Sequence, residues 1–131
     1  MRLLRCLPVI GVMGLLFYLS SLPGNTLVMP DILSFDKLLH AFAYGVLAAA
    51  VFFAIPNRRR HQPRLIFLLI VLFCLLYGIS DEVHQIFVPF RSSSGWDILA
   101  DTVGAAIAVL LLQARQQRLA QPQLENSLEI S

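Results

Sequence analysis

The chain has 131 residues, of which 57% are hydrophobic and only 14% are charged, and its mean hydropathy is +0.73. Soluble domains carry about 25% charged residues, so this composition excludes an ordinary soluble domain and indicates an integral membrane protein. The formal net charge of +2 gives no support for nucleic-acid binding.

The first apolar segment is predicted at about residues 7–22 and follows Arg2 and Arg5. Such a start also resembles a secretory signal, in which a basic region precedes a short apolar one. The sequence SSLPGN that follows is not an A-x-A cleavage site, and the apolar run is long. We therefore expect a retained helix, with cleavage as the alternative.

Three further apolar segments are predicted as membrane helices, at about residues 38–55, 65–84 and 97–113. A helix needs about 20 residues to cross roughly 30 Å of hydrocarbon, and the last two segments reach that length only with their acidic residues included. The expected fold class is all-α, an integral membrane four-helix bundle within residues 1–115. The polar residues 116–131 are predicted as an irregular cytoplasmic tail.

Basic residues gather before the first predicted span, between the second and third, and after the fourth. They are Arg2 and Arg5, the loop Arg58–Arg64, and Arg115 and Arg118. Basic residues close to span ends favour the cytoplasmic side of a membrane. We therefore expect both termini in the cytoplasm and the loops 23–35 and 88–96 outside.

Ionisable residues reach a similar depth on three of the predicted helices. At helical rise, the distances from the nearest basic residues place His40, Asp81 and Asp101 about 27, 26 and 21 Å along their helices. Residues three and four apart share a helix face, so Asp36 and Tyr44 lie on the face of His40. Charged groups at membrane depth are costly and turn away from lipid. The pattern predicts a small polar pocket that opens toward the outer surface.

Small residues recur at four-residue intervals on the second and fourth predicted helices. They are Ala41, Gly45 and Ala49 on one, and Ala100, Gly104 and Ala108 on the other. Because small side chains let membrane helices approach one another, we expect close packing around the pocket.

Three polar motifs, together with the four-helix plan, resemble the VanZ-like family of small bacterial membrane proteins. The motifs are SSLPG at 20–24, DKLLHAFAYGVL at 36–47 and SDEVHQIFVPFRSSSGWDILADTVGA at 80–105. The resemblance covers roughly Leu15 to Leu112. It implies a multi-pass protein of the bacterial inner membrane and cell envelope, in a family whose name-giving member is linked to low-level teicoplanin resistance. It implies no established mechanism or ligand.

The resemblance also marks the candidate ligand-binding residues. The positions that match the family's polar pattern are Asp36, Lys37, His40, Tyr44, Asp81, Glu82, Gln85, Arg91, Ser94, Asp97 and Asp101. One departure is Phe90, where the family pattern has a small residue, commonly glycine, after Pro89. The chain therefore departs from the family pattern in the turn before Arg91.

One reading of these residues is a binding site for a polar headgroup at the outer leaflet. Lys37 and Arg91 would receive a phosphate group, since guanidinium and ammonium groups both suit phosphate. The acidic residues or His40 would receive hydroxyl or amine groups. Besides the lipid bilayer itself, the expected partner is a lipid-linked cell-wall precursor or a phospholipid headgroup.

The alternative reading is a membrane-embedded hydrolase or transferase that acts on a lipid phosphate. The candidate catalytic residues are His40 and Glu82, and the candidate metal ligands are Asp81, Glu82, Asp97 and Asp101. Carboxylates suit Mg²⁺ or Mn²⁺, the only cofactor that this reading requires. The chain has no HExxH, G-x-S-x-G or P-loop motif.

A purely structural role is the third reading, in which Lys37 and Arg91 pair with the acidic residues to hold helix hairpins together. Carboxylates outnumber these two cations, and buried ion pairs contribute little net stability.

Overall fold

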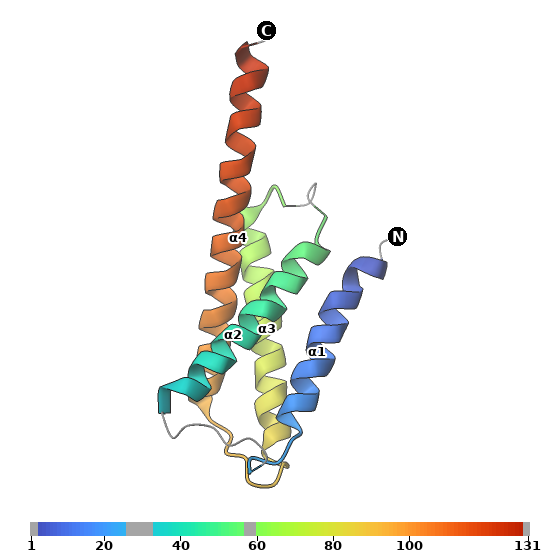
Figure 1. Cartoon of the computed structure of the whole chain (residues 1–131), viewed down its shortest axis with the longest axis vertical. Helices are drawn as coiled ribbons and strands as arrows, with labels where there is room; N and C mark the ends of the chain where they lie inside the picture. Colours follow the sequence, from blue (N-terminus) through green and yellow to red (C-terminus); the bar gives the residue numbers. More distant parts are fainter. Residues whose placement is uncertain (1–2, 26–32, 57–59, 130–131) are drawn as a thin grey trace.

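A computed structural model describes residues 3–25, 33–56 and 60–129 of the chain. These residues contain a short 3-10 helix, η1 (Leu3–Cys6), and four α-helices, with no strand among them. The α-helices are α1 (Leu7–Ser20), α2 (Leu33–Ala54), α3 (Pro63–Gln85) and α4 (Gly95–Glu129) (Figure 1). The predicted all-α fold class is confirmed.

Proline and arginine residues define several of the helix ends. α1 and α3 each have a proline in the first turn, where the missing N–H has no helical partner to lose. α2 ends just before Pro56, and its last carbonyls are satisfied by a side chain from the next loop. The Arg60 guanidinium donates hydrogen bonds to the carbonyl oxygens of Phe52 (2.8 Å) and Ile55 (3.0 Å). The local sequence thus both starts and stops these helices.

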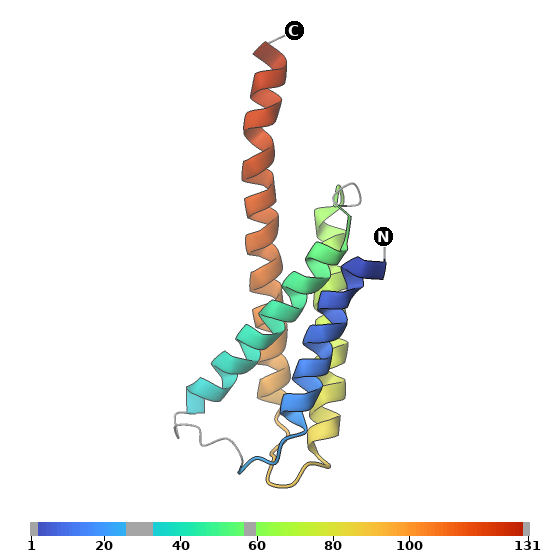
Figure 2. The same ribbon diagram turned by 45° about the vertical axis from the view of Figure 1, so that its right-hand side comes forward.

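Consecutive helices run in opposite directions, as the two ribbon views show (Figures 1 and 2). α1 and α3 end at one end of the bundle, where α2 and α4 begin. We call this the acidic end, because it carries Asp36, Asp81, Glu82, Asp97 and Asp101. We call the opposite end, from which α4 extends, the basic end, because it carries Arg60, Arg64, Arg115 and Arg118.

The two ladders of small residues form one seam between α2 and α4. A Cβ atom placed on Gly45 would lie 3.4 Å from the carbonyl oxygen of Gly104. A Cβ atom on Gly104 would lie only 1.9 Å from the carbonyl oxygen of Ala41, too close for any side chain. The close approach that the sequence predicts is confirmed, and it brings the first turns of α2 beside those of α4.

A hydrophobic core fills the bundle between the seam and the basic end. Leu47, Ile70, Cys74 and Val109 are each at most 1% exposed, and they come from α2, α3 and α4. The Tyr77 hydroxyl donates a hydrogen bond of 2.7 Å to a carbonyl of α1, at Met13. The core therefore begins directly beneath the acidic end.

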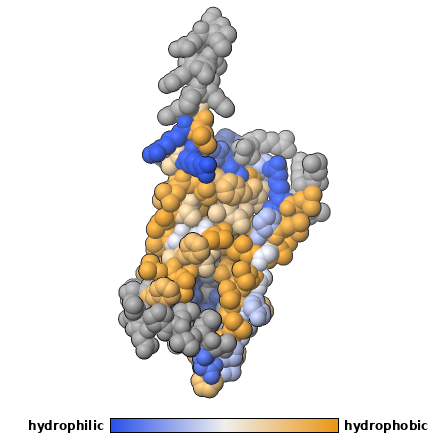
Figure 3. Space-filling view, in the orientation of Figure 1, coloured by the Kyte–Doolittle hydropathy of each residue, from blue (hydrophilic) through white to orange (hydrophobic). Residues whose placement is uncertain are grey.

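The outside of the bundle is an apolar belt between two polar ends (Figure 3). Three stretches, Phe35–Ala54, Pro63–Gln85 and Gly95–Ala120, are long and apolar enough to cross a membrane, whereas the apolar helix Leu4–Ser20 is shorter. Exposed side chains such as Phe42, Leu68 and Leu111 form this surface. Such a belt is the surface of a helical membrane protein.

The segment after residue 115 differs from the expectation of an irregular tail. α4 continues without a break to Glu129. The segment is polar, but glutamine, arginine, leucine and alanine are all good helix formers. Helix propensity therefore supports α4 through residues 116–121 despite the lack of an apolar face, whereas Pro122 beyond them lies inside the helix with no N–H to donate.

Candidate functional site

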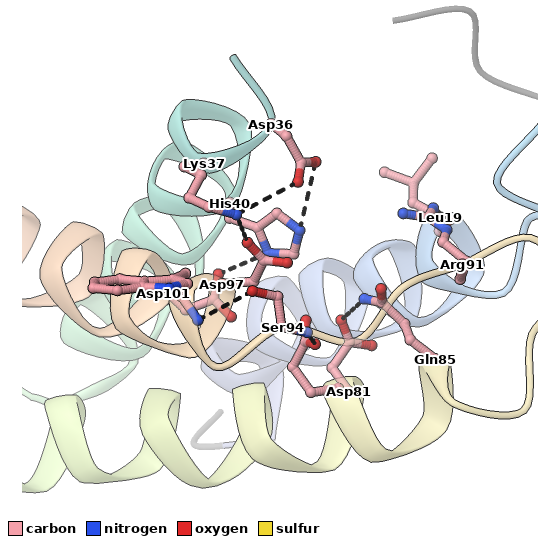
Figure 4. Close-up of polar contacts among 12 residues, drawn as sticks. Leu19, Asp36, Lys37, His40, Asp81, Gln85, Arg91, Ser94, Asp97 and Asp101 are labelled. Carbon is pink, nitrogen blue, oxygen red and sulfur yellow. Dashed lines mark hydrogen bonds and ion pairs between the residues drawn. The ribbon is translucent and has the colours of Figure 1, made fainter. Parts of the chain in front are cut away.

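A cleft of about 210 Å³ lies at the acidic end, bounded by all four helices or the loops that join them. Its lining is mostly polar and consists of Gly24, Asp36, His40, Gln85, Phe90, Arg91, Ser92 and Asp97. Figure 4 shows the side chains of α2, α3 and α4 converging around it. The cleft lies among the helices where the sequence predicts a polar pocket, and its opening toward the outer surface stays a prediction.

Two polar pairs join α2 to α4 on successive turns. The Lys37 ammonium group forms a salt bridge with Asp97, and the His40 Nδ1 atom lies 3.0 Å from the Asp101 Oδ1 atom (Figure 4). Both carboxylates are buried, with Asp97 4% and Asp101 1% exposed. Asp97 also lies in the first turn of α4, where the helix dipole stabilises a negative charge.

α3 supplies two buried carboxylates behind the cleft. Asp81 Oδ2 accepts a hydrogen bond of 3.2 Å from the side-chain amide of Gln85, one turn further along the helix. Glu82 Oε2 accepts one of 2.7 Å from the backbone N–H of Ser94. Because Ser94 immediately precedes α4, Glu82 fixes the start of that helix against α3.

Three buried polar atoms near the cleft have no hydrogen-bond partner among the described residues. They are the Tyr44 hydroxyl, Glu82 Oε1 and Asp101 Oδ2. Asp101 lies against Gly78, where an added Cβ atom would be 3.0 Å from Oδ2. An unsatisfied buried polar atom costs about 1–3 kcal/mol, so this cluster is not arranged for stability alone.

Arg91 fastens the end of α1 to the cleft. Its guanidinium donates hydrogen bonds to the carbonyl oxygens of Leu19 (2.8 Å) and Leu22 (3.2 Å). Nearby, the backbone N–H of Gly24 donates to the carbonyl of Pro89 at 3.1 Å. The loop after α3 and the end of α1 are thus held together by hydrogen bonds from both the Arg91 side chain and the backbone.

A second contact between α1 and α3 lies beside Arg91. The single hydroxyl hydrogen of Ser21 goes to the Phe17 carbonyl at 2.6 Å, so the His84 Nε2–H group donates to Ser21 Oγ at 3.0 Å. The Phe17 and His84 rings lie 4.7 Å apart. His84 therefore serves the attachment of α1.

The unusual residue Phe90 lies in the turn that forms part of the cleft wall. Its φ angle of 60° falls in the left-handed region, which costs a residue with a Cβ atom roughly 1–2 kcal/mol and costs glycine little. A Cβ atom on Gly24 would lie 1.7 Å from the Phe90 carbonyl oxygen, so the turn also needs a glycine opposite it. The backbone conformation explains why a small residue suits position 90.

The predicted ligand-binding residues occupy three different positions. Five line the cleft: Asp36, His40, Gln85, Arg91 and Asp97. Four are buried behind the cleft: Tyr44, Asp81, Glu82 and Asp101. Lys37 is half-buried and is paired with Asp97. Ser94 contributes its backbone N–H to Glu82, while its hydroxyl accepts from the N–H of Trp96.

One group of residues could hold a metal ion, and it overlaps the predicted set of metal ligands at Asp97, while that set stays a prediction. Among the described residues, one group has candidate ligand atoms within 4.8 Å of one another, and it consists of Asp36, His40 and Asp97. Only Asp97 was among the predicted metal ligands, and Asp81, Glu82 and Asp101 lie outside the group. The spacing of Asp36 and His40 by four residues was the signal in the sequence that could have identified this set.

Sequence reasoning also missed Gly24 and Ser92 as parts of the cleft. Both lie in the polar motifs, SSLPG and FRSSSG, that carry the family resemblance. Their position in the cleft depends on loop geometry, which those motifs do not reveal by themselves.

The sequence also matches a known protein family. The model of the VanZ/LLP1 family matches residues 6–116, which include every residue of the cleft. No curated protein and no solved structure matches the chain. With three helices able to cross a membrane and most of its length matched by this model, the chain is a multi-pass membrane protein that belongs to the VanZ/LLP1 family.

Proposed function

We propose that the protein spans the bacterial inner membrane four times and binds the headgroup of a lipid-linked envelope molecule in its cleft. Arginines concentrated at the basic end support a cytoplasmic position for that end and for both termini. The first apolar helix, Leu4–Ser20, would reach about 26 Å at helical rise, a small mismatch that a bilayer accommodates. The cleft then opens at the outer face.

The observation that carries this proposal is a polar cleft at the edge of an apolar belt. Its volume of about 210 Å³ is below the roughly 300–1,000 Å³ of pockets that enclose whole drug-sized ligands. It suits a headgroup whose acyl chains remain in the bilayer. A soluble ligand of the same polarity would gain nothing from the surrounding apolar surface.

The groups at the mouth of the cleft suit a headgroup that contains phosphate together with hydroxyl or amine groups. Arg91 uses two of its donors on carbonyls of α1, and a guanidinium has five. Asp36 is 45% exposed and can accept hydrogen bonds from a ligand. A lipid-linked cell-wall precursor and a phospholipid both have this chemistry.

Resistance to glycopeptides of the teicoplanin type is the expected phenotype, because a bound precursor or an altered headgroup would change access to the envelope. We expect expression in a glycopeptide-susceptible bacterium to raise the inhibitory concentration. We also expect Asp81→Asn to lose that effect while inserting normally, because it changes the charge behind the cleft. Equal resistance from Asp81→Asn and the wild type would contradict the proposal.

The direct test is the identity of lipids that co-purify with the protein in mild detergent, measured by mass spectrometry. The wild type should retain one lipid class far above its share of the membrane, and Arg91→Ala should not. Arg64→Ala is the matched control, because Arg64 is exposed at the opposite end of α3. A bulk lipid composition in all three samples would contradict headgroup binding.

The second candidate function, a metal-dependent hydrolase or transferase on a lipid phosphate, is favoured by the group Asp36, His40 and Asp97 in the cleft. With His40 as a ligand, Glu82 is the remaining candidate base. Incubating the protein with envelope lipids, with and without divalent cations, separates the two functions. New lipid masses would establish an enzyme, and retained but unchanged lipid would establish a binder.

A further inference from the structure

The first turns of α2 and α4 bring one imidazole and two carboxylates together in the cleft. Asp36 and His40 are four residues apart on one face of α2, and Asp97 faces them from α4 (Figure 4). Their candidate ligand atoms lie within 4.8 Å of one another. A metal held at about 2.0–2.2 Å from each ligand in a tetrahedral site needs them roughly 3.4 Å apart, so the side chains must move together, and the 45% exposed Asp36 side chain has room to make that adjustment.

His40 is already oriented as a metal ligand. Its Nδ1 atom lies 3.0 Å from Asp101 Oδ1, so that with Asp101 ionised and the imidazole neutral, Nδ1 carries the hydrogen. The lone pair is then on Nε2, which lies 3.9 Å from Asp36 Oδ1. A histidine that ligates a metal through one nitrogen and donates the other to a carboxylate is a recurrent arrangement.

Charge balance points independently to a cationic ligand. At this end, the described side chains include the carboxylates Asp36, Asp81, Glu82, Asp97 and Asp101 against the cations Lys37 and Arg91. Two carboxylate oxygens, Glu82 Oε1 and Asp101 Oδ2, are buried without a partner among the described residues. Buried negative charge in an apolar bundle is costly unless it is compensated. A divalent cation supplies the compensation that the side chains do not.

We propose that Asp36, His40 and Asp97 bind one divalent transition-metal cation, Zn²⁺ or Mn²⁺, and that Lys37 gives up Asp97 when the cation binds. The imidazole nitrogen favours such an ion over Mg²⁺, which prefers oxygen ligands. Lys37 is 34% exposed and can turn toward solvent. Asp101 is a positioning residue, because it acts through His40.

Three protein ligands leave a coordination position open. One part of this inference rests on the proposed function: the open coordination position receives a phosphate oxygen of the bound headgroup, beside Arg91. The metal site itself requires no lipid, so the two can be tested apart.

The test is calorimetric titration of Zn²⁺ and Mn²⁺ into the purified full-length protein after treatment with a chelator, with bound metal counted by mass spectrometry. We expect one ion per chain and at least a tenfold loss of affinity in each of Asp36→Asn, His40→Gln and Asp97→Asn. His84→Gln is the matched control, because this histidine lies at the same end but contacts Ser21, and it should change affinity less than twofold.

Asp101→Asn tests the positioning role. It should weaken metal binding by about 10- to 100-fold, the usual effect of removing an outer-shell partner. It should also shift the visible absorption of bound Co²⁺, a change that a loss of stability alone would not produce. An unchanged Co²⁺ spectrum with unchanged affinity would remove Asp101 from the site.

Lys37→Met tests the metal site without removing a ligand, so it applies even if a ligand variant fails to fold. Removing the competing ammonium group should raise metal affinity several-fold, and added metal should raise the melting temperature of this variant more than that of the wild type. Failure of the wild type to bind either ion, or equal binding in all variants, would overturn the proposal. Binding of Mg²⁺ alone, without an effect of His40→Gln, would overturn it too.

Failure of the metal site and failure of the proposed function give different results. Protein that co-purifies with its lipid but binds neither Zn²⁺ nor Mn²⁺ would leave headgroup binding intact and remove only the metal site. Protein that binds one metal ion per chain but co-purifies with lipids in the same proportions as the membrane would leave the metal site intact and remove headgroup binding.

Discussion

Two arginines perform the same local task at opposite ends of the bundle. Arg60 donates two hydrogen bonds to carbonyls at the end of α2, and Arg91 donates two to carbonyls at the end of α1. At the basic end the Arg60 guanidinium lies over the Phe52 ring, 4.2 Å from its centre. At the acidic end the Arg91 side chain borders an open cleft.

The difference separates a packed helix end from one that borders an open cleft. Around Arg60 an aromatic ring occupies the space beneath the cation. Arg91 instead lines an open cleft together with the carboxylates Asp36 and Asp97. The same capping chemistry therefore supports structure at one end and leaves room for binding at the other.

The largest effect should come from breaking the seam on which the acidic end depends. Gly104→Leu places a side chain where even a Cβ atom meets the Ala41 carbonyl oxygen, so α2 and α4 cannot keep their present separation. We expect a loss of about 3 kcal/mol or more, measured by unfolding in detergent. Gly14→Leu is the control, because nothing lies within 4 Å of a Cβ atom there. Equal stability of the two variants would contradict the seam.

A smaller effect is expected from leaving Asp97 without its cation. Lys37→Met should cost about 1–2 kcal/mol in metal-free protein, less than the 3–5 kcal/mol for a fully buried pair because Lys37 is 34% exposed. The double variant with Asp97→Asn should recover most of the loss. A double-mutant cycle by thermal unfolding measures the coupling, and additive losses would show that the pair is not coupled.

The comparison of the two arginines can be tested directly. Arg60→Ala and Arg91→Ala should each cost about 1–2 kcal/mol, since each variant loses two hydrogen bonds from a charged donor near the surface. Only Arg91→Ala should also lose the co-purifying lipid. If Arg60→Ala lost the lipid equally, capping alone would account for both residues.

The smallest effect should be a gain in stability at the cleft wall. Phe90→Gly removes a Cβ atom from a residue with a φ angle of 60°, and we expect about 0.5–1 kcal/mol after the entropic cost of glycine. Phe87→Gly is the control, since Phe87 is equally exposed but has no positive φ, and it should lose stability. A loss in both variants would show that the turn at position 90 is not strained.

Local sequence patterns predicted much of the fold and of the cleft. The apolar segments predicted the helices, the ladder Ala41, Gly45 and Ala49 predicted a close approach, and the shared depth of His40 and Asp101 predicted a polar layer. Each of these inferences depends on spacing along one helix, which the sequence states directly. The segment after residue 115 was the exception, because its helix depends on propensity rather than on an apolar face.

The pairing of side chains across helices was not predictable in the same way. Whether Lys37 meets Asp97 or another acidic residue depends on how α2 and α4 are rotated about their axes. That rotation follows from the contact of Gly104 with Ala41, which no single-helix pattern contains. Likewise, Arg91 donates to carbonyl oxygens at and just after the end of α1. Every residue has a backbone carbonyl, so the sequence does not indicate which ones accept.

The hydrophobic core beneath the acidic end limits what the cleft can do with a guest molecule. Leu47, Phe52, Ile70 and Val109 close the bundle between the cleft and the basic end. A headgroup that enters the cleft must therefore leave through the same opening. Under the proposed function, the headgroup would therefore be bound and released on one side of the membrane.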